Sequence, residues 1–126
     1  MARGFSFSRP VGTGGEAVNR GEVYWVDFGG NAGMRPGVVL TRPAGLRFLT
    51  SATFGPMTTT TRNSPSWVNV GIKEGLPEDG AINLDNILTV ELRHVKQLIC
   101  ELSTTRMAQI DQAARFALAL DSPPED

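Results

Sequence analysis

Short runs of alternating or β-branched residues, separated by glycine and proline, occupy most of the chain and predict a β-rich protein. The strands expected from these runs are Arg20–Phe28, Gly37–Arg42, about Leu46–Phe54, Trp67–Val70, Ala81–Asp85 and Lys96–Leu102. Gly29–Gly33 is expected to form the loop after the first strand, Pro36 to open the second, and Gly55-Pro56 to end the third. Asn86–Val95 is ambiguous, and a strand followed by one helical turn would fit it.

Helical periodicity occurs near the C-terminus. Ser103 is a residue type that caps helix N-termini. The apolar residues that follow it at helical spacing are Met107, Ile110, Ala114, Ala117 and Leu118. This stripe should pack on the sheet, and Pro123-Pro124 should stop the helix from continuing. Many short strands with one amphipathic helix favour a small, strongly curved sheet or an open barrel.

The length of 126 residues suits a single domain with one core. Residues 1–18, rich in Gly, Ser and Arg, are expected to form a flexible arm, residues 19–120 the folded domain, and residues 121–126 an acidic tail. The sequence has neither a run of about 18 apolar residues nor a signal-peptide core, so we expect a cytoplasmic protein without a membrane partner. Cys100 is the one cysteine, which excludes a disulfide framework and favours a buried small hydrophobe.

Charge is unevenly distributed along the chain. The net charge of -1 argues against a protein that coats nucleic acid by charge alone. The segment Met34–Asn69, however, has no acidic residue and contains Arg35, Arg42, Arg47 and Arg62. We therefore expect a positive patch near the middle strands.

Arginine and threonine residues at predicted strand ends are the remaining candidates for a functional site, because the sequence lacks the motifs of other common sites. The sequence has no Walker loop, no transition-metal cluster and no nucleophile elbow, so neither a metal nor a cofactor is expected. Arg35 closes the Gly-rich loop, where a guanidinium suits a phosphate, and Thr58–Thr61 could grip the same group beside Arg62. Spacing alone still favours a surface salt bridge for Arg35 and a polar loop for the threonines.

Several blocks, taken in order, carry a family resemblance. Arg20–Phe28, Arg35–Leu40 and Pro56–Thr59 are similar to the corresponding blocks of the MazF/PemK toxins, and Asp85–Val90 is similar to their Asp-Gln-Ile-Arg-Thr-Val block. The segment Glu101–Leu120 resembles their terminal helix. The resemblance therefore runs from Arg20 to Leu120.

This resemblance implies a single-domain SH3-like barrel of the kind shared with CcdB, usually a homodimer. It also implies the toxin of a type II toxin–antitoxin system, a sequence-specific, metal-independent endoribonuclease that cleaves single-stranded mRNA. An acidic antitoxin would silence the enzyme, and DNA would be bound only through the toxin–antitoxin complex.

The family's catalytic pair corresponds to Arg35 and Thr58. Thr59 is the fallback if the register slips by one, and it is expected to bind substrate together with Arg62, Asn86 and Arg20. In the implied reaction the 2′-OH of one nucleotide attacks the adjacent phosphate and leaves a cyclic phosphate. The base that takes up its proton is not identified from the sequence.

Some expectations concern residues outside this pair. His94 is expected to be structural or on the surface, and Trp25 and Trp67 are expected in the core, although exposed tryptophans could stack on bases. Gly29–Met34 is shorter than the family's usual loop. Two alternatives stay open: a CcdB-like gyrase poison, disfavoured because the chain does not end in Trp-Gly-Ile, and a non-catalytic RNA- or peptide-binding module.

Overall fold

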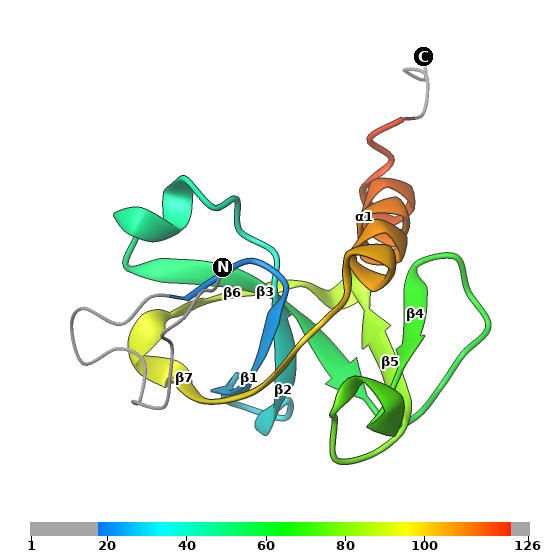
Figure 1. The fold of residues 1–126 in the computed structure, drawn as a ribbon, viewed down its shortest axis with the longest axis horizontal. Helices are drawn as coiled ribbons and strands as arrows, with labels where there is room; N and C mark the ends of the chain where they lie inside the picture. Colours follow the sequence, from blue (N-terminus) through cyan, green and yellow to red (C-terminus); the bar gives the residue numbers. More distant parts are fainter. Residues whose placement is uncertain (1–17, 122–126) are drawn as a thin grey trace.

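The structure, a computed structural model, describes residues 18–121, which form one curved antiparallel sheet and one C-terminal helix (Figure 1). Its strands are β1 (Glu22–Asp27), β2 (Met34–Val39), β3 (Ser51–Thr58), β4 (Trp67–Val70), β5 (Gly80–Asn83), β6 (Leu88–Glu91) and β7 (Val95–Glu101). The helices are α1 (Thr104–Leu118) and the 3-10 turns η1 (Gly45–Arg47), η2 (Ile72–Glu74), η3 (Leu84–Asn86) and η4 (Leu92–His94). The predicted fold class, mainly β with a C-terminal helix, is confirmed.

The ends of the chain limit what the structure says about the predicted arm and tail. Val18, the last residue assigned to the arm, is buried in the core. The rest of the arm and the tail beyond Asp121, including Pro123-Pro124, lie outside the described residues. The division into arm, domain and tail therefore stays a prediction.

The strands follow the order β4-β5-β3-β2-β1-β7, and β6 pairs with β3 beside β5. Every pairing is antiparallel. Within residues 18–121 no ladder joins β4 to β7, so the sheet is curved and open, without detected closure into a barrel. Helix α1 stands beside β4 and β5 and covers the face that carries Val68, Val70 and Ile82 (Figure 1).

Helix α1 begins where the sequence predicts. The Ser103 side chain accepts a hydrogen bond from the Arg106 backbone N–H at 3.0 Å, which satisfies one of the free donors of the first turn. Ile110 and Ala113 are its buried residues. The predicted stripe is correct at Ile110, and Met107, Ala114 and Ala117 pack against the same core. It is wrong at Leu118, which is half exposed and lines a surface groove.

The third strand differs most from the prediction. Residues expected to open it form η1 instead, and β3 continues through Gly55-Pro56 to Thr58. On one edge β3 pairs with β6 up to Phe54 and with β5 from Met57. The edge is unpaired at Pro56, so a residue without a backbone N–H costs no hydrogen bond there.

The remaining boundaries shift by a few residues. Strand β2 begins at Met34 and ends at Val39, so Arg35 and Pro36 lie within the strand rather than before it. Residues 84–86 form η3 rather than the end of a strand. The ambiguous segment Asn86–Val95 contains β6 followed by the 3-10 turn η4, which matches the strand and helical turn that the sequence allowed.

Candidate active site

Arg35 lies near the start of β2, where backbone carbonyls hold its side chain. Its Nε donates to the Ala32 carbonyl oxygen at 2.8 Å, and its Nη1 donates to the Met57 carbonyl oxygen at 3.3 Å. No described carboxylate pairs with it, so the salt-bridge interpretation of this arginine is wrong for residues 18–121. Two of the five guanidinium N–H groups fix the side chain, and three remain for an anion.

The short loop between β1 and β2 makes this arrangement possible. Gly33 has a φ of 62°, a left-handed conformation that glycine adopts without strain, and its N–H donates to the Gly29 carbonyl oxygen at 3.0 Å. The chain therefore folds back and presents the Ala32 carbonyl to Arg35. A short loop is thus compatible with an ordered Arg35.

Thr58 lies at the end of β3, with its backbone paired to Ala81 of β5. Its Oγ1 accepts a hydrogen bond from the Thr60 backbone N–H at 3.1 Å. That bond occupies an acceptor position of the hydroxyl and leaves the hydroxyl proton available. The Thr58 hydroxyl can therefore donate a hydrogen bond to an anion bound next to it.

One pocket of about 440 Å³ contains both residues. Its lining residues are Trp25, Met34, Arg35, Pro36, Met57, Thr58, Thr59, Thr60, Pro77 and Glu78. The structure therefore brings the predicted pair and Thr59 together. It also places Trp25, which the sequence offered as a stacking residue if exposed, in the pocket wall, and it adds two parts that the sequence analysis missed: Met34 and the loop containing Glu78.

The pocket combines chemical groups that suit an RNA strand. The free guanidinium donors and the threonine hydroxyls can bind a phosphate, and charge-assisted bonds of this kind are strong. Trp25 is half-buried rather than in the core, so its ring is partly available to a base. Among residues 18–121, no group of three or more His, Cys, Asp or Glu side chains is placed to hold a metal ion.

Arg62 and Trp67 form a second cluster that does not line this pocket. The Arg62 guanidinium lies 5.2 Å from the centroid of the Trp67 ring, and the indole N–H donates to Asp85 at 3.2 Å. Trp67 is half-buried, so the expectation that both tryptophans belong to the core is wrong. Asn86 is exposed at the end of η3, also away from the pocket lining.

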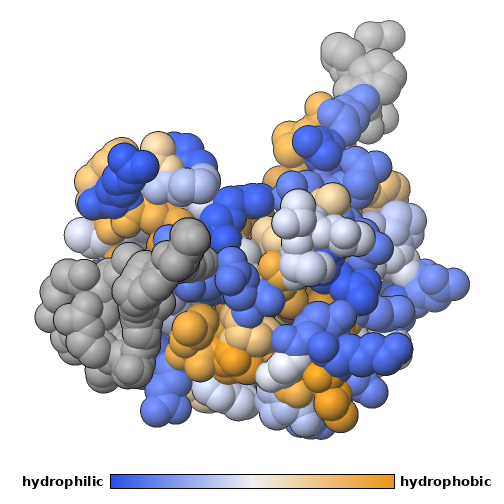
Figure 2. All heavy atoms as spheres, viewed as in Figure 1, coloured by the Kyte–Doolittle hydropathy of each residue, from blue (hydrophilic) through white to orange (hydrophobic). Residues whose placement is uncertain are grey.

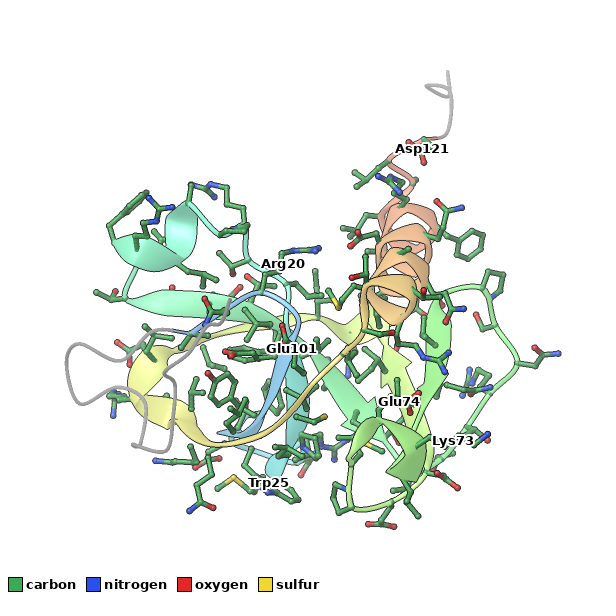
Figure 3. The ribbon with its side chains drawn as sticks, in the orientation of Figure 1. Arg20, Trp25, Lys73, Glu74, Glu101 and Asp121 are labelled. Carbon is green, nitrogen blue, oxygen red and sulfur yellow. The ribbon has the colours of Figure 1, made fainter. Side chains whose placement is uncertain are left out.

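Arg20 lies apart from the pocket, at the opposite end of β1 from Trp25 (Figure 3). Its Nη2 pairs with Asp111 of α1 at 2.7 Å, and its Nε donates to the Leu40 carbonyl oxygen at 2.9 Å. These contacts tie the start of β1 to the helix. Substrate binding by Arg20, as by Arg62 and Asn86, stays a prediction.

His94 and Cys100, the chain's one imidazole and one thiol, also do not line the pocket. His94 is half-buried in the turn η4. Cys100 lies in β7 and is half-buried rather than fully buried as expected. Its partial burial and the nearby charge of Glu74 raise the pKa of its thiol to about 11. A thiol with this pKa is protonated at neutral pH and a poor nucleophile.

Comparison with known proteins decides the family. The model of the PemK-like, MazF-like toxins of type II toxin–antitoxin systems matches residues 19–118. The chain belongs to this family. The endoribonuclease MazF1 of Mycobacterium bovis is 32% identical over 104 residues, which cover 82% of this chain and 95% of that relative. The endoribonuclease EndoA of Bacillus subtilis is 29% identical over 111 residues, which cover 82% of this chain and 96% of that relative.

Solved structures agree with this membership in the MazF/PemK family. A mycobacterial endoribonuclease in complex with its cognate antitoxin superimposes with a TM-score of 0.76 at 32% identity, covering 85% of this chain and all of that chain. A MazE–MazF complex from Deinococcus radiodurans has a TM-score of 0.67 at 19% identity and supports the fold alone. The predicted family, fold and enzyme class, an endoribonuclease of a type II toxin–antitoxin system, are confirmed.

No helix in residues 18–121 of this MazF-family chain is long and apolar enough to cross a membrane. The catalytic and substrate-binding residues remain predictions, because the comparisons identify the family without assigning roles to individual side chains.

Proposed function

We propose that this MazF-family toxin cleaves single-stranded mRNA at specific sequences in the cytoplasm without a metal ion, with Arg35 and Thr58 as its catalytic pair. The supporting observation is that the free donors of Arg35 and the hydroxyl of Thr58 line one pocket. Both side chains are already fixed by backbone contacts. Donors held in place before the substrate binds need little reorganisation during the reaction.

The proposed reaction is an internal transesterification. The 2′-oxygen of one nucleotide attacks the adjacent phosphorus, the bond from phosphorus to the 5′-oxygen breaks, and a 2′,3′-cyclic phosphate and a 5′-hydroxyl form. Arg35 stabilises the additional negative charge of the phosphorane, and Thr58 donates to a non-bridging oxygen. Each such donor is worth about 3 kcal/mol in the transition state.

Sequence preference would come from groups around the phosphate site. Thr59 lies in the pocket beside Thr58, and Trp25 and Met34 offer an apolar surface to a base. We propose that the strand continues toward Arg62 and Trp67, whose ring and cation together suit base stacking. Asn86 and Arg20 are proposed as more distant contacts.

The partners that we propose are an acidic antitoxin, a second copy of the chain, and DNA only through the antitoxin complex. The groove of about 410 Å³ between the sheet and α1 is lined by Leu49, Ile87, Ala114 and Leu118 among others. Apolar side chains are exposed around η1 and at the end of α1 (Figure 2). An exposed apolar surface of this kind suits a protein partner, and sedimentation equilibrium would detect the proposed homodimer.

The proposal is tested by cleavage of single-stranded RNA in EDTA. The purified chain should cut at defined positions, while Arg35→Ala and Thr58→Val should each lose about 100-fold or more of kcat and still fold, as checked by circular dichroism. Arg93→Ala is the matched control, because Arg93 is exposed and, among residues 18–121, its side chain pairs with Glu91 alone, at the other end of the sheet. Full activity in either pocket variant would contradict the assignment, and RNA bound but uncut by the wild type would favour the binding module instead.

A further inference from the structure

A short loop fixed at both ends forms one side of the pocket. Leu76 is 4% exposed and belongs to the core, and Gly80 begins β5. Between them Asp79 accepts a hydrogen bond from the Ile72 backbone N–H at 3.0 Å. Pro77 and Glu78 are therefore held at the pocket without being buried themselves.

The loop lies directly against the end of β3. Ala81 pairs with Thr58, and a methyl group built on Gly80 would overlap the Thr58 carbonyl oxygen. This close approach determines the position of the loop relative to Thr58. Glu78 therefore lines the same pocket as Arg35 and Thr58.

Glu78 is not engaged elsewhere in the structure. None of the described residues forms a hydrogen bond or an ion pair with its carboxylate. Among the ten residues that line the pocket, Arg35 and Glu78 are the charged ones, and the adjacent carboxylate of Asp79 is bonded to Ile72. An ionised carboxylate in this position has acceptor oxygens available for a substrate.

We propose that Glu78 is the general base of the reaction, an inference that rests on the proposed function. The Glu78 carboxylate takes the proton of the 2′-OH as the bond from the 2′-oxygen to phosphorus forms. The bond from phosphorus to the 5′-oxygen breaks, the leaving oxygen takes a proton from water, and Glu78 later returns its proton to solvent. Charge and protons balance, and no oxidant, reductant or metal is required.

The other polar groups of the pocket are poor candidates for this role. The Arg35 guanidinium is always protonated in proteins and cannot accept a proton. The threonine hydroxyls are donors to the phosphate in the proposed reaction and are far weaker bases than a carboxylate. His94, the one imidazole, lies in η4 and does not line the pocket.

The test compares Glu78→Gln with wild type in single-turnover cleavage and in binding of an uncleavable RNA with 2′-deoxyribose at the cut site. Glu78→Gln should lower kcat by about 100-fold to 10,000-fold, the usual range for a general base. Affinity for the 2′-deoxy RNA should be unchanged or slightly higher, because a negative charge is removed. The rise of log kcat with pH on the acid side should disappear in Glu78→Gln and return in part in Glu78→Asp.

Glu91→Gln is the matched control for the change of charge. Glu91 is exposed and lies opposite Ser51, at the other end of β3 from Thr58. The kcat of Glu91→Gln should therefore equal that of wild type. Wild-type kcat in Glu78→Gln would overturn the proposal, whether or not binding of the 2′-deoxy RNA is weaker. Arg35→Ala, assayed in parallel, separates the two failures: if it abolishes cleavage while Glu78→Gln does not, the function stands and Glu78 is not the base.

Discussion

Replacing Gly80 by alanine should disrupt the close contact between the start of β5 and the pocket residue Thr58 at the end of β3. Gly80 begins β5, and a methyl group on it would overlap the Thr58 carbonyl oxygen and approach the Met57 Cε atom within 3.0 Å. A methionine side chain can move, but a carbonyl oxygen within a ladder cannot move without the strand. The substitution must therefore separate β5 from the end of β3.

The expected cost follows from the geometry. Overpacking costs 1–3 kcal/mol in general, and the rigid backbone partner places Gly80→Ala near the upper end, about 3 kcal/mol. Gly30→Ala is the matched control, because Gly30 has a φ of 54° and no atom within 4 Å of the added methyl. Only the left-handed conformation is strained there, at about 1 kcal/mol. Both substitutions restrict the unfolded chain equally, so the difference of about 2 kcal/mol reports the contact.

Thermal denaturation followed by circular dichroism measures this difference. At about 4 °C per kcal/mol for a domain of this size, Gly80→Ala should melt about 8 °C below Gly30→Ala. Its cleavage rate should also fall, because Thr58 and Glu78 both move with the contact. Equal melting temperatures for the two variants would refute the reasoning.

Three further predictions concern residues outside the pocket. Ser103→Ala should cost about 1 kcal/mol of unfolding free energy in a urea titration, because the Arg106 N–H loses its capping acceptor. Cys100 should react with a thiol reagent at pH 8 far more slowly in the folded protein than in urea, because burial and Glu74 raise its pKa to about 11, and equal rates would count against this. Partial burial alone would raise the pKa of Glu74, but the hydrogen bond from Gly71 and the contact with Arg106 outweigh it and lower the pKa. The stabilisation by Glu74 should therefore be complete above about pH 5 and lost as pH falls through the lowered folded-state pKa, so the melting temperatures of wild type and Glu74→Gln should converge in acid.

Local sequence patterns predicted those elements whose signal is local. The β-branched and aromatic residues of β1 and the Ser103 cap of α1 appear at the expected places. The third strand was misplaced because Pro56 was treated as a strand breaker. Its tolerance depends on an unpaired stretch of the edge, where β6 ends and β5 has not begun, and this is a property of the tertiary fold.

The site shows the same division between local and distant information. Arg35 and Thr58 could be proposed from the order of their blocks along the chain. Glu78 could not, because its position depends on Gly80 meeting a strand that ends 22 residues earlier in the chain. The one available signal was the Leu76–Gly80 segment itself, with an apolar residue, a proline and a glycine around a carboxylate.

The chemistry of the RNA ends tests the central claim most directly. The purified chain is incubated with single-stranded RNA in EDTA, and the ends of the fragments are identified by mass spectrometry. We expect 2′,3′-cyclic phosphate and 5′-hydroxyl ends, together with no cleavage when the nucleotide before the cut carries 2′-deoxyribose. Fragments with 5′-phosphate and 3′-hydroxyl ends, or cleavage of the 2′-deoxy substrate, would contradict the claim.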